Sequence, residues 1–251
     1  MSYPFFYIPN YTGEQEEFVL TEENSRHIVQ VLRMKPGERL FLTDGKGHLL
    51  TVSVLDDHKK KCRVRVESIA QHPRPENKVI VAISLLKNAS RFEWFLEKAM
   101  EIGVTGIFPL LCERTEKQHF RRDRMQSILV SGLLQSRQTW LPDLSEPQPF
   151  DKFIVSGAVA SERKYIAHCM EEQRLSLADE VCNGKQQGGS SLILIGPEGD
   201  FTKEEIGEAL QLGFLPVTLG ETRLRTETAG IVVATLLCLG VQRVQGGIST
   251  F

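Results

Sequence analysis

The stretch from Leu192 to Thr235 constrains the fold more than any other part of the chain. It contains two short apolar runs, Leu192–Ile195 and Phe214–Leu219, and each is followed directly by a glycine. Apolar runs of this length, separated by a helix-like segment, are typical of buried parallel strands in an α/β unit. We therefore expect two loops, GPEGD at 196–200 and GETRLRTET at 220–228, at the carboxyl edge of a parallel sheet. Open α/β sheets bind their ligands at this edge.

The segment between these strands carries signals for both ends of a helix. Thr202 is a good N-cap, and Glu204 and Glu205 lie in the first turn, where acidic side chains are favourable. Gly213 lies where a glycine would end the helix. The sequence therefore predicts a strand–helix–strand unit with a binding site after each strand.

Residues 1–72 have a different pattern, which predicts a small β-rich domain. One helix interrupts it, with Thr21 as N-cap, an apolar face of Ile28, Val29, Val31 and Leu32, and an end at Pro36. Short strands with a single helix suggest a small closed barrel. The predicted strands are Phe5–Ile8, Glu17–Leu20, Arg39–Thr43, Leu49–Leu55 and Arg63–Ile69.

The segment 72–76 (HPRPE) predicts a stiff linker, since proline disfavours helix in the residue before it. We therefore expect two domains, 1–72 and 73–251. After the linker, strand-like and helix-like segments alternate, which indicates a parallel sheet. These segments are Val79–Leu86 (strand), Arg91–Ile102 (helix), Gly106–Leu111 (strand), Arg122–Gln135 (helix) and Lys164–Ala167 (strand).

Charge, cysteine content and hydropathy exclude several classes of protein. With 30 basic and 32 acidic residues the formal net charge is -2, so nucleic-acid binding has to come from local patches. The five cysteines include no CxxC pair, which argues against a disulfide framework or a zinc site. The run 229–241 is too short to span a bilayer, and the N-terminus does not resemble a signal peptide. We expect a cytoplasmic protein without a metal.

Several charged residues stand where the predicted strands end. Arg223, Arg225 and Glu227 crowd a loop that leads into an apolar helix, and charges held near a core need partners. A functional site explains them better than a solvated surface does. GPEGD is either a plain turn or a loop that approaches a ligand, and it does not match a nucleotide phosphate motif. Lys87 and Arg91 follow the first strand of the second domain, where an anionic substrate could bind.

A basic run in the first domain has two interpretations. Lys59, Lys60, Lys61 and Arg63 could form a solvated hairpin, or they could contact the phosphates of RNA. Arg26 and Arg33 on the predicted helix could extend such a patch.

The paired motifs IGPEGDF and LGETRLRTETA resemble those of the RsmE family, the small-subunit ribosomal RNA uridine-N3 methyltransferases of the SPOUT superfamily. HIVQVLRMKPGE at 27–38, KNASRFEWFLEKAMEIGV at 87–104 and LLQSRQTWLPDL at 133–144 agree with this resemblance. It implies an N-terminal PUA-like barrel for RNA and a C-terminal α/β domain with a deep trefoil knot. It also implies that S-adenosylmethionine binds in the knot and that the chain forms a homodimer.

The resemblance assigns roles to individual residues. In the implied reaction, Arg225 or Arg91 could stabilise negative charge on the uracil, and Glu227 or Glu198 could accept a proton or order the loop. The cofactor-binding residues would be Ala167, His168, Ile195, Gly196, Pro197, Glu198, Gly199, Leu219, Gly220, Leu224, Arg225, Thr226 and Thr228. The RNA-binding residues would be Arg26, Arg33, Lys59, Lys60, Lys61, Arg63 and Lys87.

The implied activity is S-adenosylmethionine-dependent methylation of a uridine N3 in 16S ribosomal RNA. Two alternatives remain: a SPOUT methyltransferase acting on another RNA or base atom, and an RNA-binding ribosome assembly factor without catalysis. Asp200 departs from the family pattern, since it replaces the second glycine of GPEGG. It adds a carboxylate at a helix start, where it could act only as an N-cap.

Overall fold

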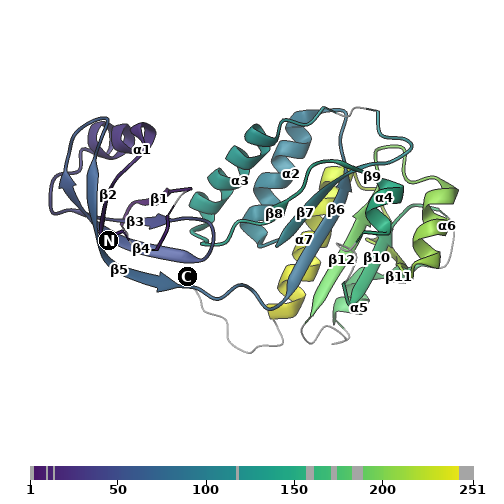
Figure 1. Cartoon of the computed structure of the whole chain (residues 1–251). Coiled ribbons are helices and arrows are strands. Elements are labelled where there is room, and N and C mark those ends of the chain that lie inside the picture. The colour runs from purple at the N-terminus through teal and green to yellow at the C-terminus, as the bar shows by residue number, and fades with distance from the viewer. Residues whose placement is uncertain are drawn as a thin grey trace. The chain divides into compact units, whose positions relative to one another are not determined.

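The computed structural model describes residues 3–9, 11–13, 15–116, 119–156, 161–170, 174–182 and 189–242. The chain forms two compact units (Figure 1). The first consists of Met1–Arg74 with Val130–Leu141, and the second of Pro75–Leu129 with Pro142–Phe251. Helix α3 (Arg122–Ser136) therefore contributes its first half to the second unit and its second half to the first.

The first unit is built on a five-stranded sheet, and each of the five predicted strands is present. β1 pairs with β3 in parallel, whereas the other neighbours are antiparallel. Inward-facing side chains such as Leu40, Leu42, Leu50 and Val52 are fully buried and form its core. The strands, in sheet order, are β1 (Phe5–Tyr7), β3 (Arg39–Thr43), β4 (His48–Asp56), β5 (Arg63–Gln71) and β2 (Glu17–Val19).

The helix of the first unit begins as predicted but changes type. Thr21 caps α1 (Glu22–Arg26) by accepting a hydrogen bond from the Asn24 amide, at 3.3 Å. The chain then continues as the π-helix η1 (His27–Val31). Ile28 is buried as expected, but Val31 is 67% exposed and Leu32 41% exposed, so their predicted place on the apolar face is wrong. The wider π turn rotates them away from the face that a 3.6-residue period assigns.

Residues after α3 return to the first unit and contact the predicted linker. The indole nitrogen of Trp140 donates to the carbonyl oxygens of His72 and Pro73, at 3.1 Å each. Gly47 faces the same ring so closely that a Cβ there would lie 2.6 Å from it. The segment 72–76 is therefore held at its start by a side chain that is distant in sequence.

The second unit contains an eight-stranded sheet in which every recorded pairing is parallel, as predicted. The strands in sheet order are β11 (Leu175–Ser176), β13 (Leu215–Thr218), β10 (Arg163–Ala167), β12 (Ser190–Ile195), β6 (Lys78–Ser84), β7 (Gly106–Leu111) and β8 (Asp143–Leu144), and β9 (Gln148–Pro149) also pairs with β7. The two-residue strands were not predicted, because segments this short carry no periodicity.

Helices cover both faces of this sheet (Figure 1). On one face α2 (Ala89–Ile102) packs against α7 (Thr226–Gln242). On the other, α4 (Phe150–Ile154) and α6 (Lys203–Gln211) cover Leu192 and Leu194. A short helix, α5 (Leu177–Cys182), follows β11 and packs against α7. The sheet is thus buried on both sides, as its apolar strands require.

The predicted ends of α6 are confirmed. Thr202 and Glu205 form a reciprocal capping box at its start. Gly213, just past its end, has a φ of 82°, which a glycine adopts without steric strain.

Candidate active site

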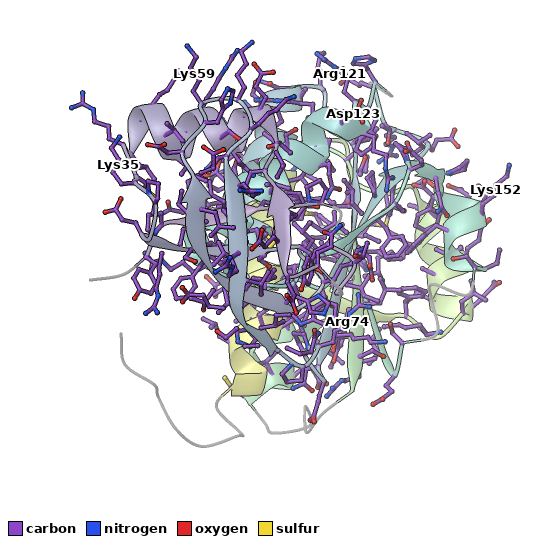
Figure 2. The ribbon with its side chains drawn as sticks, turned by 60° about the vertical axis from the view of Figure 1, so that its left-hand side comes forward. Lys35, Lys59, Arg74, Arg121, Asp123 and Lys152 are labelled. Atoms are coloured by element: carbon purple, nitrogen blue, oxygen red, sulfur yellow. The ribbon has the colours of Figure 1, made fainter. Side chains whose placement is uncertain are left out.

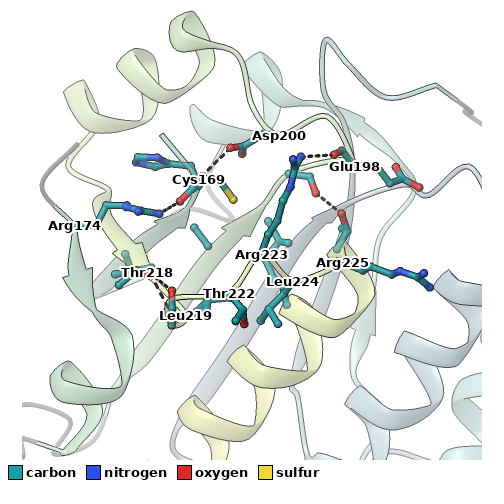
Figure 3. A pocket seen from close by; sticks show the side chains of 18 of the residues that line it. Cys169, Arg174, Glu198, Asp200, Thr218, Leu219, Thr222, Arg223, Leu224 and Arg225 are labelled. Atoms are coloured by element: carbon teal, nitrogen blue, oxygen red, sulfur yellow. Dashed lines mark hydrogen bonds between the residues drawn. The ribbon is translucent and has the colours of Figure 1, made fainter. Parts of the chain in front are cut away.

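A cavity of about 480 Å³ lies at the carboxyl edge of β13, β10 and β12 (Figure 3). All predicted cofactor-binding residues line it except Gly199 and Thr228, which are not among the lining residues in the described part of the chain. The structure therefore brings together residues from three loops that are separated in sequence. It adds lining residues that were not predicted: Cys169, Arg174, Asp200, Val217, Thr218, Glu221, Thr222, Arg223 and Ala229.

Hydrogen bonds from the β13 loop hold the GPEGD loop. The hydroxyl of Thr226 donates to the carbonyl oxygen of Gly196 at 3.0 Å, and this bond is buried. The Arg223 guanidinium donates to the carbonyl oxygen of Glu198 at 3.1 Å, and Figure 3 shows its side chain reaching toward that residue. Hydrogen bonds therefore link the two sequence motifs to each other.

Asp200 connects the GPEGD loop to the loop after β10. Its φ is 65°, a left-handed conformation that few non-glycine residues adopt. One carboxylate oxygen accepts from the Cys169 amide at 2.8 Å, and the other accepts from the Phe201 amide at 2.8 Å. The prediction that Asp200 caps α6 is wrong, because Thr202 is the cap. The chain needs an αL residue here, and aspartate supplies one that also bonds the neighbouring loop.

His168 follows β10, as predicted, and lines the cavity. It is 4% exposed, and its carbonyl oxygen accepts a hydrogen bond from Arg174 at 2.5 Å. Arg174 also lines the cavity. The sequence gives no signal for this arginine, since it does not belong to a recognised motif.

The predicted catalytic residues lie around the first turn of α7. Glu227 has a side chain that is 8% exposed, and one of its oxygens lies 3.6 Å from Nε of Arg91 on α2. The other oxygen, Oε2, is buried and has no hydrogen-bond partner within the described ranges. Arg225 lines the cavity with part of its length, while its guanidinium extends away from it (Figure 3). A buried carboxylate oxygen without a donor is costly, which makes Glu227 an unusual group, although neither Glu227 nor Arg91 is among the cavity-lining residues of the described chain.

Lys87 in the loop after β6 contacts Glu198 in the loop after β12. The Lys87 amide donates to the Glu198 carboxylate at 3.3 Å. The Lys87 ammonium lies 2.6 Å from Glu116, and its pKa is raised, chiefly by this hydrogen bond. An anionic ligand at Lys87 therefore has to compete with Glu116.

The predicted basic patch lies on the first unit, apart from Lys87 on the second. Arg26 and Lys60 both approach Glu22, at 2.5 and 3.6 Å, so the helix and the β4–β5 loop share a surface. Figure 2 shows Lys59 directed away from the ribbon. Arg33 is exposed with a φ of 57°. These positions suit contact with a phosphate backbone.

The described residues provide neither a metal-binding cluster nor a membrane-spanning helix. No group of three or more His, Cys, Asp or Glu side chains within these ranges is placed to hold a metal ion. No helix in the same ranges is long and apolar enough to cross a membrane.

Comparison with known proteins gives consistent matches. Residues 73–238 match the family described as RNA methyltransferase domain, and residues 20–67 match the RNA methyltransferase PUA domain. The crystal structure of a probable rRNA-methyltransferase from Porphyromonas gingivalis is 34% identical, with a TM-score of 0.87, and the match covers 97% of this chain and 100% of that one.

Two further proteins extend this similarity. Ribosomal RNA small subunit methyltransferase E from Mesomycoplasma hyopneumoniae is 29% identical over 232 residues, which are 90% of this chain and 96% of that protein. The protein of that name from Neisseria gonorrhoeae was solved bound to S-adenosylmethionine. It is 27% identical, with a TM-score of 0.79, and the match covers 99% of this chain and 100% of that one. These matches confirm the resemblance seen in the motifs, and the chain therefore belongs to the RNA methyltransferase family that includes the proteins named ribosomal RNA small subunit methyltransferase E.

Proposed function

We propose that this protein transfers a methyl group from S-adenosylmethionine to N3 of a uridine in 16S ribosomal RNA. The observation that carries the proposal is the cavity formed by three loops at the carboxyl edge of the sheet. Its lining includes residues of both family motifs, and the Neisseria gonorrhoeae relative was solved with S-adenosylmethionine.

The cavity fits this cofactor in size and chemistry. Its volume lies within the range of about 300–1,000 Å³ that small-molecule sites occupy. Val217, Leu219, Leu224 and Ala229 supply apolar surface for an adenine ring. Gly196 also lines the cavity, and a Cβ there would crowd the Phe201 ring at 3.1 Å, so this position favours glycine. The binding residues in this proposal are those predicted: Ala167, His168, Ile195, Gly196, Pro197, Glu198, Gly199, Leu219, Gly220, Leu224, Arg225, Thr226 and Thr228.

The bound cofactor would supply an electrophilic methyl group on its sulfonium. The N3 lone pair of uracil becomes nucleophilic only when the N3 proton leaves. Glu227 is the proposed proton acceptor, because Oε2 lacks a donor within the described ranges, whereas the Glu198 carboxylate already accepts from the Lys87 amide. Arg225 and Arg91 would stabilise the negative charge that develops on the uracil oxygens.

The first unit would bind the RNA substrate. Its match to a PUA domain and its exposed basic residues support this role. Arg26, Arg33, Lys59, Lys60, Lys61 and Arg63 would contact phosphates, together with Lys87 of the second unit. In this proposal residues 1–72 close into a barrel, residues 73–251 form the catalytic domain with a trefoil knot, and the protein acts in the cytoplasm.

A homodimer is also part of the proposal. Trp94 on α2 is 44% exposed and Leu239 on α7 is 48% exposed, and these two helices pack against each other. Large apolar side chains on neighbouring helices suit an interface between two copies of the chain. Light scattering during size-exclusion chromatography would give the mass directly.

The function is tested by a methyl-transfer assay with labelled S-adenosylmethionine on small ribosomal subunits from cells that lack this gene. The RNA is then digested and its nucleosides are separated by mass. We expect N3-methyluridine from the wild type, and strongly reduced product from R225A. R124A is the matched control, because Arg124 bonds Glu93 at an exposed site and does not line the cavity. Label on another base or another RNA would contradict the proposed substrate. No transfer by a protein that binds the donor would favour the assembly-factor alternative.

A further inference from the structure

The GPEGD loop is also held by a residue outside the cavity. Nη1 of Arg114 donates to the carbonyl oxygen of Gly199 at 2.8 Å and lies 3.4 Å from that of Phe201. Arg114 is not among the cavity-lining residues of the described chain. It follows β7, which supplies none of the three cavity loops. The loop is therefore bonded from two directions, by Arg223 on the cavity side and by Arg114 on the other.

A rigid turn carries Arg114. The Thr115 amide donates to the carbonyl oxygen of Cys112 at 3.0 Å, and the Thr115 hydroxyl oxygen accepts from the Cys112 amide at 2.9 Å. The same hydroxyl lies 2.8 Å from that of Ser84, which is fully buried. These bonds fix the backbone on both sides of Arg114, although its guanidinium lies at the surface. The backbone position of Arg114 is therefore fixed by hydrogen bonds within the fold.

One buried carboxylate ties this turn to the helix that follows the GPEGD loop. Glu205 is 9% exposed, and one of its oxygens accepts from the Glu113 amide at 2.9 Å. Its other oxygen accepts from the Thr202 amide at 2.8 Å as part of the capping box of α6. Both the turn that carries Arg114 and the start of α6 are therefore hydrogen-bonded to the Glu205 carboxylate. Displacement of either segment would break one of these bonds.

The absence of a side chain at Gly199 leaves room for Arg114. A Cβ at position 199 would lie 3.3 Å from Cδ of Arg114, so the arginine stem packs directly against the glycine backbone. Any side chain at this position would therefore displace the Arg114 stem.

We propose that Arg114 is a positioning residue for donor binding. By bonding the Gly199 carbonyl and packing on its backbone, it holds the Glu198–Asp200 peptides in the conformation that forms the cavity wall. The inference rests on the proposed function, in which this cavity takes S-adenosylmethionine. It adds a residue that does not contact the donor and that contributes to affinity through preorganisation of the loop.

Calorimetric titration of S-adenosylmethionine and S-adenosylhomocysteine into the RNA-free protein tests this inference. We expect R114A to bind both about tenfold more weakly, since hydrogen bonds from a charged donor are lost. R114M keeps the stem on Gly199 without a donor and should also bind weakly. R114K can give one bond to the Gly199 carbonyl and should recover part of the affinity. R124A should match the wild type.

Steady-state kinetics give a second readout. The KM for the donor should rise in R114A, while the KM for RNA and kcat at saturating donor stay at wild-type values. Wild-type donor affinity in both R114A and R114M would overturn the positioning role while leaving the proposed function intact. A fall in kcat at saturating donor without any change in donor affinity would also overturn it. Failure of the wild type to bind the donor would instead contradict the proposed function.

Discussion

The hydroxyl of Thr226 and the carbonyl oxygen of Gly196 form a buried hydrogen bond of 3.0 Å across 30 residues of sequence. Thr226 is the first residue of α7, and Gly196 directly follows β12. The bond therefore joins the start of one helix to the end of a strand at the cavity wall.

Removal of this bond should reduce both stability and donor affinity. T226V leaves the Gly196 carbonyl buried without its partner, which we expect to lower the free energy of unfolding by about 1–3 kcal/mol. T226S keeps the hydroxyl and should retain most of that stability. Urea denaturation checks the first effect, and titration with S-adenosylmethionine checks the second. Equal stability of T226V and the wild type would show that the bond contributes little.

Gly230 should not tolerate alanine, although it lies inside a helix. A Cβ there would lie 2.6 Å from the buried ring of Phe95 and 3.1 Å from Ile83. Alanine normally stabilises a helix by about 1 kcal/mol over glycine, but overpacking costs about 1–3 kcal/mol. We expect G230A to be destabilised. Gly207 in α6 is the matched control, because within the described residues nothing beyond its chain neighbours and its own helix backbone lies within 4 Å of its Cβ position, so G207A should be more stable than the wild type in thermal unfolding.

Substitutions at Asp200 should separate backbone strain from side-chain bonding. Both D200A and D200G lose the bonds to the Cys169 and Phe201 amides. Only alanine retains a Cβ at a φ of 65°, which costs about 1–2 kcal/mol for an L-residue. We therefore expect D200A to be less stable in urea than D200G, and also less stable than D200N. The reverse order would mean that the loop relaxes out of its left-handed conformation.

The five free thiols should fall into two reactivity classes. Burial raises the pKa of Cys62 to about 11, and those of Cys112 and Cys238 to about 12, whereas Cys169 and Cys182 are exposed. A thiol-specific reagent at pH 8 should modify two thiols of the native protein. S-adenosylmethionine should protect Cys169, which lines the cavity, and leave Cys182 reactive. In C169S, S-adenosylmethionine should no longer reduce the number of modified thiols. Equal protection of both thiols would point to a wider conformational change.

The same buried thiols set an expected response to alkaline pH. Their pKa values are higher in the folded protein than the ordinary value of 9.0, so folding favours the protonated form. The stability they contribute is complete below about pH 9 and is lost as the pH rises toward the folded values. Denaturation curves between pH 8 and 10.5 should show this decline, and C238A should reduce its slope. An identical slope in C238A would assign the decline to other groups.

The sequence was sufficient for the strands and helices whose signals are local. Runs such as Leu192–Ile195 are apolar because both faces of the parallel sheet are covered, and the Thr202–Glu205 cap needs only neighbouring residues. The π-helix could not be foreseen from a 3.6-residue period, so Val31 was assigned to the wrong face.

Part of the site depends on contacts that have no local signal. Arg114 lies 85 residues from Gly199 in sequence, and Arg174 enters the cavity through a bond to His168. Asp200 illustrates a different limit. Its position near a helix start indicated a cap, but its left-handed φ and its bond to Cys169 follow from how two loops approach each other.

The order of strands in the second unit separates the loops at the carboxyl edge of its sheet into two groups. The cavity belongs to the loops after β13, β10 and β12, whereas Lys87 follows β6 and Arg114 follows β7. The β12 loop lies between the two groups and accepts hydrogen bonds from both, from Arg223 after β13 and from Arg114 after β7. Substitutions in the loops after β6 and β7 would therefore leave the cavity-lining residues unchanged, as long as Gly199 keeps its contact with Arg114.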